Sequence, residues 1–394
     1  TSLILNKINF KKDKWNITLL ISSSLIFVST INSIYINPSE ISNRNTTIIL
    51  ATSFRWILMF ISFNSFQFYL KKDIQRILFA KAFLLGSIPI IISCIAQYWF
   101  KIYGPINLFN GLFIWFNKPF IYLDQGVAGL FSNQNYTGIW LAVLWPFCIF
   151  YLRKERSSKT KKYLIIFFTI LNFYFIIMTI SRSAILGVLI SLPLIISIKL
   201  LIKIIFFIAM ILCFFYFTIP LNLLEQLDIL IPNSLKLLFS KIIDLNLYNW
   251  SNLPRINIWK NAIKFINNKP LLGYGAGSFP ILFMGLGILI RADHTHNIIL
   301  QIAFEFGIPL AILLSLFVTF LLLNSYKKLY YNNKFNNKNI NIDKCWFASS
   351  LIVLVAQIYD ITYFDGRVGL LIWVLLAGLK CIIEDENYNN NICD

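Results

Sequence analysis

The chain has 394 residues, of which 58% are hydrophobic and only 13% are charged, and its mean hydropathy is +0.70. A soluble protein carries about 25% charged residues, so this composition excludes a soluble enzyme and a secreted disulfide scaffold. The formal net charge of +18 does not indicate nucleic-acid binding, because Lys and Arg lie mainly in short segments between apolar runs, as they do in membrane proteins.

The apolar runs are about 18 to 25 residues long, which is enough for a helix to cross about 30 Å of hydrocarbon. A bilayer offers no water to backbone groups, so continuous apolar runs of this length form helices. The strict alternation of barrel strands is absent. We therefore predict an all-α, polytopic transmembrane helix bundle that forms a single integral membrane domain over 1–394. The ten predicted spans are 17–36, 46–70, 77–100, 134–152, 163–180, 183–198, 204–220, 296–324, 345–363 and 367–383.

The distribution of Lys and Arg predicts the orientation of these spans. If the N-terminus is cytoplasmic, the cytoplasmic segments hold 22 of the 35 basic residues, the outer segments hold 12, and Arg55 lies inside a span. This excess matches the positive-inside rule, so both termini are expected in the cytoplasm. Residues 1–16 are polar and basic and lead into a full-length span, which is not the pattern of a cleavable signal peptide.

The segment 221–295 is the only large stretch outside the predicted spans, and it falls on the outer face. We expect it to form a loop of short amphipathic helices over 221–230, 235–248 and the residues after Pro254. In the last of these, Ile256, Trp259, Ile263 and Ile266 recur at helical spacing and form one face. Such a stripe suits a helix at the membrane interface, and it equally suits a loop packed on the bundle.

The two histidines of the chain, His294 and His296, lie together where this loop meets the eighth span. A neutral imidazole accepts a proton near neutral pH, so the pair is a candidate for general base chemistry. Two histidines and Asp293 could instead ligate zinc. The outer face offers no further Cys or His, so the interpretation without a metal is preferred.

Three arginines stand out by position. Arg182 lies in a short outer turn, Arg255 lies in the outer loop, and Arg55 lies deep in a span. The planar guanidinium binds phosphate oxygens bidentately, and a cation inside a span is a functional candidate or pairs with a helix end. The glycines at 272–278 lack the Lys-Ser/Thr of a nucleotide loop and predict a tight turn that lets backbone approach a neighbour or a ligand.

Six cysteines are scattered without CxxC spacing, and none lies in the outer loop 221–295. This arrangement predicts no disulfide bonds.

Four segments together resemble the O-antigen ligase and O-antigen polymerase superfamily of bacterial membrane proteins. They are Gly129–Gly138, Ser181–Ala184, the pair Arg255–Trp259 and Lys269–Phe279, and His294–Gly307, in which His-Asn is followed by nine residues and Gly. Each segment alone is a weak signal, but their order, spacing and common side of the membrane are specific over about residues 125–380. The chain departs from the family pattern at Gly126, where members often carry Arg, and at Gln134, where Pro is common.

The resemblance implies an inverting, metal-independent glycosyltransferase without a cofactor. Its donor would be a glycan on undecaprenyl diphosphate, and its acceptor would be lipid A core. In this mechanism His296 is the general base, and Arg182 and Arg255 bind and stabilise the diphosphate. The predicted substrate-binding residues are His294, Asn297, Glu305, Asn135, Arg291 and Arg55.

Two other functions remain open from the sequence. A repeat-unit polymerase would use the same lipid-linked donor with a growing glycan as the acceptor. A small-anion transporter of the bicarbonate type would use the same number of helices, although inverted repeats are not visible. The predicted location is the bacterial inner membrane with the active face in the periplasm, and the partners are the donor, the acceptor and the bilayer, without nucleic acid.

Overall fold

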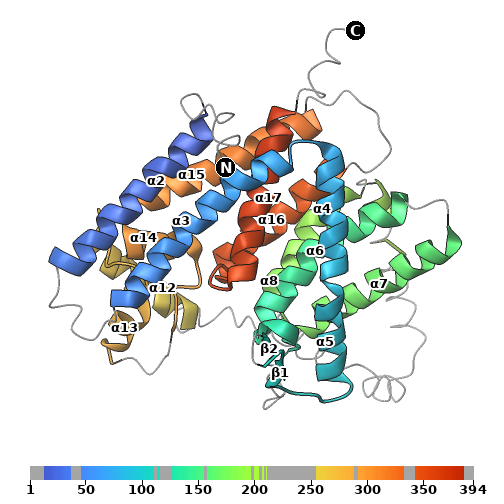
Figure 1. Cartoon of the computed structure of the whole chain (residues 1–394), viewed down its shortest axis with the longest axis horizontal. Helices are drawn as coiled ribbons and strands as arrows, with labels where there is room; N and C mark the ends of the chain where they lie inside the picture. The colour runs from blue at the N-terminus through green and yellow to red at the C-terminus, as the bar shows by residue number, and fades with distance from the viewer. Residues whose placement is uncertain are drawn as a thin grey trace, which may run out of the picture. The chain divides into compact units, whose positions relative to one another are not determined.

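The computed structural model describes residues 13–36, 46–110, 113–115, 126–154, 158–196, 199–203, 206–207, 210, 254–287, 292–331 and 342–385. These residues are predominantly helical, as predicted, with one short antiparallel hairpin of strands β1 (Ile106–Leu108) and β2 (Phe113–Trp115) that the sequence analysis did not predict. The helices form two compact units (Figure 1).

The first unit combines the beginning of the chain with the segments 247–332 and 357–394. In it α3 packs on α2 and α17, and α15 packs on α2 and α17, so that these four long helices share one core (Figure 1). The shorter α14 packs against α12 and α15. The helices of this unit are α2 (Lys14–Ile31, continued by the π-turn Asn32–Ile36), α3 (Thr46–Tyr69), α12 (Pro254–Asn268), α13 (Phe279–Met284), α14 (Ile298–Phe306), α15 (Ile308–Tyr326, continued by the π-turn Lys327–Tyr331) and α17 (Gly366–Glu384).

The second unit holds 72–246 and 333–356. Its centre is α6, which packs on α4, α7 and α8. Its helices are α4 (Asp73–Gly86), α5 (Ile88–Tyr98), the 3-10 turn Gly129–Phe131, α6 (Gln134–Lys154), α7 (Lys159–Met178), α8 (Arg182–Ile195) and most of α16 (Ile342–Tyr359).

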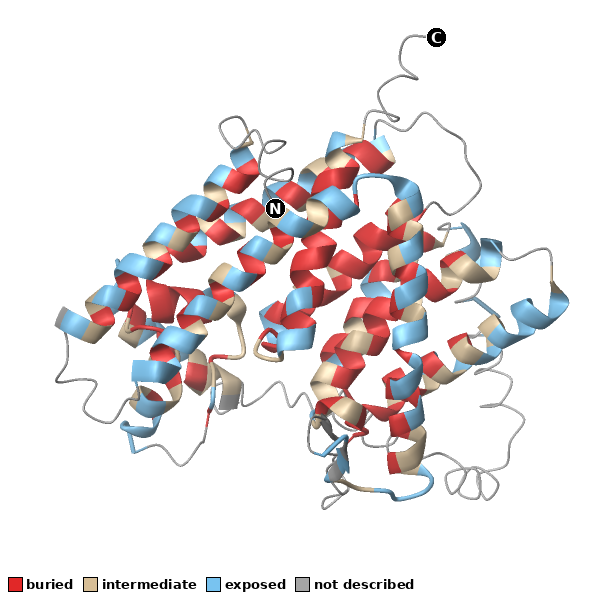
Figure 2. Cartoon of the chain, in the orientation of Figure 1, coloured by how far each residue is buried: buried red, intermediate tan, exposed pale blue. Residues whose placement is uncertain are grey.

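Among the described residues, eight helices are long and apolar enough to cross a membrane, and α8 is a shorter apolar helix. The predicted span 204–220 lies largely outside the described residues. The surface of the long helices fits lipid, since apolar side chains such as Leu20, Phe27 and Phe54 are more than half exposed. Figure 2 shows exposed residues recurring along these helices. The chain is therefore a multi-pass helical membrane protein.

The predicted span 296–324 is wrong as a single helix. The structure ends α14 at Phe306 and begins α15 at Ile308, with Gly307 between them at φ +96°. A Cβ at Gly307 would lie 2.1 Å from the carbonyl oxygen of Leu271, so only glycine fits here. Hydropathy does not detect the break, because Gly307 interrupts the helix without interrupting the apolar run.

Two cations that were counted with the cytoplasmic segments are buried in the helical units. In the second unit, Arg76 Nε lies 2.7 Å from Asp343 Oδ1, and its Nη2 lies 3.1 Å from Oδ2, with no exposed side-chain surface on Arg76. In the first unit, the ammonium of Lys380 bonds Asp13 and the side-chain oxygen of Gln67. Opening either pair would leave a buried charge without its partner, so each one ties distant segments together.

Candidate active site

The histidine hairpin, residues 292–297, enters α14 in the first unit. His296 has φ +56°, a left-handed conformation that costs a non-glycine residue about 1–3 kcal/mol and persists where neighbouring bonds enforce it. Such bonds hold Thr295, the residue before His296. Thr295 donates its N–H to Gln301 Oε1 at 2.9 Å, and its carbonyl oxygen accepts the indole N–H of Trp259 at 2.8 Å.

Asn297 begins α14 as its N-cap. Its Oδ1 accepts the N–H groups of Ile299 and Leu300 at 3.0 and 3.1 Å, and its Nδ2 donates to the carbonyl of Ile358 at 3.2 Å. Capping satisfies backbone donors that the first helical turn leaves unpaired. These contacts give Asn297 a structural task beside the substrate-binding task that the sequence predicts.

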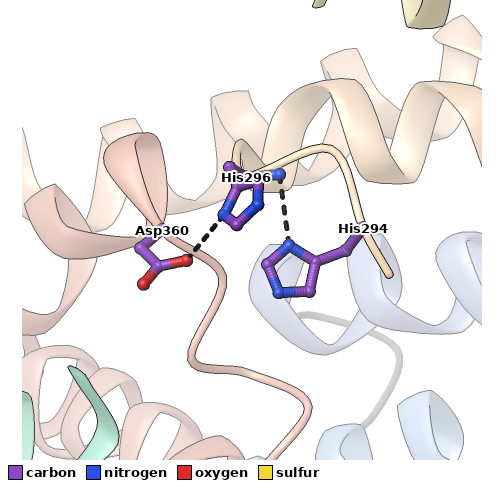
Figure 3. A group of neighbouring side chains, drawn as sticks. All are labelled: His294, His296 and Asp360. Atoms are coloured by element: carbon purple, nitrogen blue, oxygen red, sulfur yellow. Dashed lines mark hydrogen bonds and ion pairs between the residues drawn. The ribbon is translucent and has the colours of Figure 1, made fainter. Parts of the chain in front are cut away.

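His296 forms a dyad with Asp360, a residue that the sequence analysis missed. His296 Nδ1 lies 3.0 Å from Asp360 Oδ1, and the side chains are 28% and 7% exposed (Figure 3). Burial alone would raise the pKa of Asp360, but the hydrogen bond with His296 and the positive charge of His296 outweigh it, so the pKa is lowered. The carboxylate can therefore only accept, so a neutral His296 carries its proton on Nδ1. Its Nε2 then presents a lone pair that can accept a proton.

His294 has the opposite tautomer. Its Nδ1 accepts the backbone N–H of His296 at 3.2 Å, so the neutral ring carries its proton on Nε2 (Figure 3). The ring stacks on Phe364 at 5.6 Å between centroids. Burial and the positive charge of His296 lower the pKa of His294 to about 4. His294 is thus a neutral support beside His296 at neutral pH.

This low pKa predicts a loss of stability in mild acid. An imidazole in an unfolded chain titrates near 6.5, so between about pH 6.5 and 4 the unfolded state binds a proton that folded His294 does not. The free energy of unfolding therefore falls as pH drops through this window, by on the order of 3 kcal/mol in total. The lowered pKa of Asp360 affects stability mainly below the usual aspartate pKa of 3.8, outside this window. The melting temperature of purified wild-type protein should fall across it, and that of His294→Phe should fall less; equal slopes would contradict the assignment.

Arg255 lies at the start of α12 and is half-buried. Its positive charge contributes to lowering the pKa values of both His294 and Asp360. Within the first unit Arg255 is therefore close enough to act on His294 and Asp360. The same helix carries Trp259, which bonds the histidine hairpin at Thr295.

The buried face of α12 differs from the predicted one. Ile258, Ala262 and Ile266 are buried, whereas Ile263 is 47% exposed. Only Ile266 of the predicted stripe is fully buried, because the packed face is rotated toward Ile258 and Ala262. The amphipathic segments predicted at 221–230 and 235–248 lie outside the described residues.

Arg55 supports the loop that carries Asp360. Its Nη1 donates to the carbonyl oxygen of Phe364 at 2.9 Å, and Phe364 in turn stacks on His294. The structure thus matches the alternative that an arginine in a span pairs with the end of another helix, because α17 begins two residues later at Gly366.

Three predicted residues fall elsewhere. Arg182 and Asn135 belong to the second unit, where Arg182 is exposed at the start of α8 and Ser181 caps that helix. The N–H of Asn135 bonds Asn133 Oδ1 at 2.8 Å. Arg291 lies outside the described residues.

The two departures from the family pattern are linked in the second unit. The side-chain oxygen of Gln134 accepts the N–H of Gly126, and a Cβ at Gly126 would lie 2.0 Å from the carbonyl oxygen of Thr179. A side chain at 126 would therefore clash with backbone in this chain.

In the described part of the chain, His294, His296 and Asp360 are the group that could hold a metal ion, with possible ligand atoms within 4.8 Å of one another. Ligands of tetrahedral zinc lie about 3.3 Å apart, a spacing that His296 Nδ1 and Asp360 Oδ1 approach at 3.0 Å but that the widest separation in the group exceeds. Both Nδ1 atoms already have hydrogen-bond partners. The geometry fits a histidine and an orienting carboxylate better than a preformed metal centre.

One feature of the sequence could have identified Asp360. It is a carboxylate within the predicted span 345–363, and ionisable residues in spans are functional candidates. Arg55 was singled out by its position in a span, and Asp360 was not. Its pairing with His296, 64 residues away, is visible only in the fold.

Comparison with known proteins bears on these residues. Residues 165–315 match the family model of the O-antigen ligase, which covers Arg182, Arg255 and the histidine hairpin. No curated protein matches the chain. The family match supports the resemblance, because residues 165–315 are similar to the O-antigen ligase family.

Proposed function

We propose that the protein transfers a glycan from a polyprenyl diphosphate, with inversion, to a hydroxyl of an acceptor lipid, and that His296 is the general base. The observation that carries this proposal is the dyad of His296 and Asp360. A base must offer a lone pair to the hydroxyl that it deprotonates, and Asp360 leaves that lone pair on Nε2. The side chain of His296 is 28% exposed, so a substrate can reach it.

The leaving group of this reaction is a lipid diphosphate whose negative charge grows in the transition state. A fixed cation placed near that charge lowers the barrier. Arg255 supplies positive potential to the histidine hairpin, and it remains protonated at any working pH. Arg182 is proposed as a second phosphate-binding cation, supported by its exposure at the start of α8.

We place the reaction at the periplasmic face of a bacterial inner membrane, with both termini in the cytoplasm. In the first unit the segments with the histidines, Asp360 and Phe364 meet at one end of the helices. The buried Lys380 lies with Asp13 and Gln67, at the segments that the charge distribution assigns to the cytoplasm.

The test is deletion of the gene in the native host, followed by gel and mass-spectrometric analysis of lipid-linked and surface glycans. Long chains stranded on polyprenyl diphosphate, with bare acceptor lipid outside, are expected if the protein is a ligase. Surface glycan reduced to single repeats would replace the ligase by a polymerase. Unchanged glycans on both carriers, together with loss of solute uptake, would overturn glycan transfer in favour of transport. Complementation with the wild-type gene is the control for secondary mutations.

A further inference from the structure

The glycine-rich turn, residues 272–278, binds the end of α14 rather than presenting an open anion site. The N–H groups of Tyr274 and Gly275 donate to the carbonyl oxygens of Phe304 and Glu305 at 2.9 and 2.8 Å. These carbonyls belong to the last turn of α14, whose acceptors would otherwise lack partners. The ring of Tyr274 also stacks on Phe304 at 5.2 Å. The turn therefore acts as a cap for α14.

Glycine is required for this close packing. A Cβ at Gly273, which has φ +65°, would lie 2.5 Å from the carbonyl oxygen of Phe304. A second close contact lies just after α14. The N–H of Ile308 donates to the carbonyl oxygen of Pro270 at 2.7 Å, and at the preceding Gly307 a Cβ would also clash with backbone. Two glycines thus let two backbones approach within hydrogen-bonding distance.

Two buried side chains continue the contact along α14 to the histidine hairpin. Glu305 Oε1 accepts the N–H of Gly277 at 2.8 Å and the Nε2–H of Gln301 at 2.9 Å. Gln301 Oε1 accepts the N–H of Thr295 at 2.9 Å. Gln301 and Glu305 are 2% and 1% exposed, and their separation of four residues places them on one face of the helix.

The orientation of the Gln301 amide is set by its neighbours. Its oxygen must face the N–H of Thr295, and its NH₂ must face the carboxylate oxygen of Glu305. Thr295 directly precedes His296, whose left-handed backbone needs fixed neighbours. A displacement of Thr295 therefore changes the direction in which the His296 ring points.

We propose that Gln301 is a positioning residue for His296, and that Glu305 and the glycine-rich turn hold Gln301 in place. This inference rests on the proposed function only where it concerns turnover, because the position of the imidazole can be measured without a substrate. Glu305, predicted above to bind substrate, acts in this arrangement through Gln301 and not by touching the substrate.

The chain offers a direct test because it contains only two histidines. Full-length protein labelled with ¹⁵N-histidine in nanodiscs should give two sets of ring signals, and His294→Phe assigns them. Nitrogen shifts distinguish the Nδ1–H tautomer expected for His296 from the Nε2–H tautomer. In Gln301→Leu the His296 signals should lose the single Nδ1–H form, because the ring no longer stays on Asp360. Unchanged His296 signals in a folded Gln301→Leu protein would overturn the proposal.

The matched control is Asn172→Leu in the second unit. Asn172 is also a fully buried amide, and its Nδ2 donates to the carbonyl of Leu141 at 3.1 Å. This variant removes a buried amide and its hydrogen bond to the carbonyl of Leu141, and it should keep the His296 signals. If both variants perturb His296 alike, the effect is a general loss of packing and the positioning role is wrong.

If Gln301→Leu does not fold, a second pair of variants tests the same chain of hydrogen bonds from Glu305 through Gln301 to Thr295. Glu305→Gln keeps an oxygen that can accept from Gly277 and Gln301, whereas Glu305→Leu removes it. The His296 signals should be retained in Glu305→Gln and disturbed in Glu305→Leu. Equal spectra for the two variants would contradict the proposal that Glu305 holds Gln301 in place.

Turnover provides an independent readout. Gln301→Leu should lower kcat for glycan transfer about ten- to a hundredfold with little change in KM, because misplacement of a reacting group costs rate more than binding. A changed NMR spectrum with no glycan transfer in the wild type would sink the proposed function and keep the positioning role. A wild-type kcat together with wild-type spectra would sink the positioning role.

Discussion

His296→Gln is expected to reduce glycan transfer about 10²–10⁴-fold, which is the usual contribution of a general base. Glutamine keeps a polar side chain that can still bond Asp360, so the hairpin should remain folded, but an amide has no lone pair of imidazole basicity. The measurement is transfer of a labelled glycan from its polyprenyl diphosphate to the acceptor lipid by purified protein in nanodiscs.

The control for His296→Gln is Lys260→Gln, an exposed cation on α12 outside the dyad. It should transfer glycan at the wild-type rate. This result would show that producing and purifying a variant does not by itself lower the activity. Transfer by His296→Gln at the rate of this control would remove His296 from the mechanism.

Asp360→Asn is expected to cost about 10²–10⁴-fold through the tautomer of His296, an effect of the size seen where an orienting carboxylate becomes an amide. The NH₂ of asparagine donates a hydrogen bond, so it would favour a lone pair on Nδ1 and move the ring proton to Nε2. The Nε2 atom of His296 would then already carry a proton and could not accept one from the acceptor hydroxyl. Transfer assays and ¹⁵N-histidine spectra of the same sample should change together.

Asp365→Asn is the matched change for this prediction. Asp365 caps α17 by accepting the N–H groups of Arg367 and Val368, and asparagine caps helices about as well as aspartate. This variant should keep both activity and the His296 tautomer. An Asp360→Asn protein with the Nε2–H tautomer and full activity would show that the base assignment is wrong.

The sequence predicted the elements that rest on local pattern. Continuous apolar runs gave the long spans, because hydropathy is set by composition over about twenty residues. The His-Asn and arginine motifs led to the resemblance that the family match over residues 165–315 supports. The hairpin at the start of α14 was also singled out, since two histidines at one junction are visible without a fold.

The parts that were missed depend on contacts between distant residues. Asp360 approaches His296 only because α16 ends beside the histidine hairpin, where Asn297 bonds the carbonyl of Ile358. The break at Gly307 depends on the backbone of Leu271. The buried face of α12 depends on which side packs against α14. None of these is encoded in the spacing of a single segment.

The separation of α14 from α15 also determines how deep the candidate site lies. The helical stretch Ile308–Tyr331 has 24 residues, or about 36 Å at 1.5 Å per residue, which exceeds the hydrocarbon thickness of about 30 Å. This stretch is long enough to span the hydrocarbon by itself, without the residues of α14. If Ile308–Tyr331 spans the hydrocarbon, the nine residues of α14 and the imidazole before them fall outside it, at the level of the lipid headgroups. A donor whose diphosphate sits among those headgroups would meet His296 while its isoprenoid tail stays dissolved in the membrane, and a water-exposed acceptor sugar could approach from the other side.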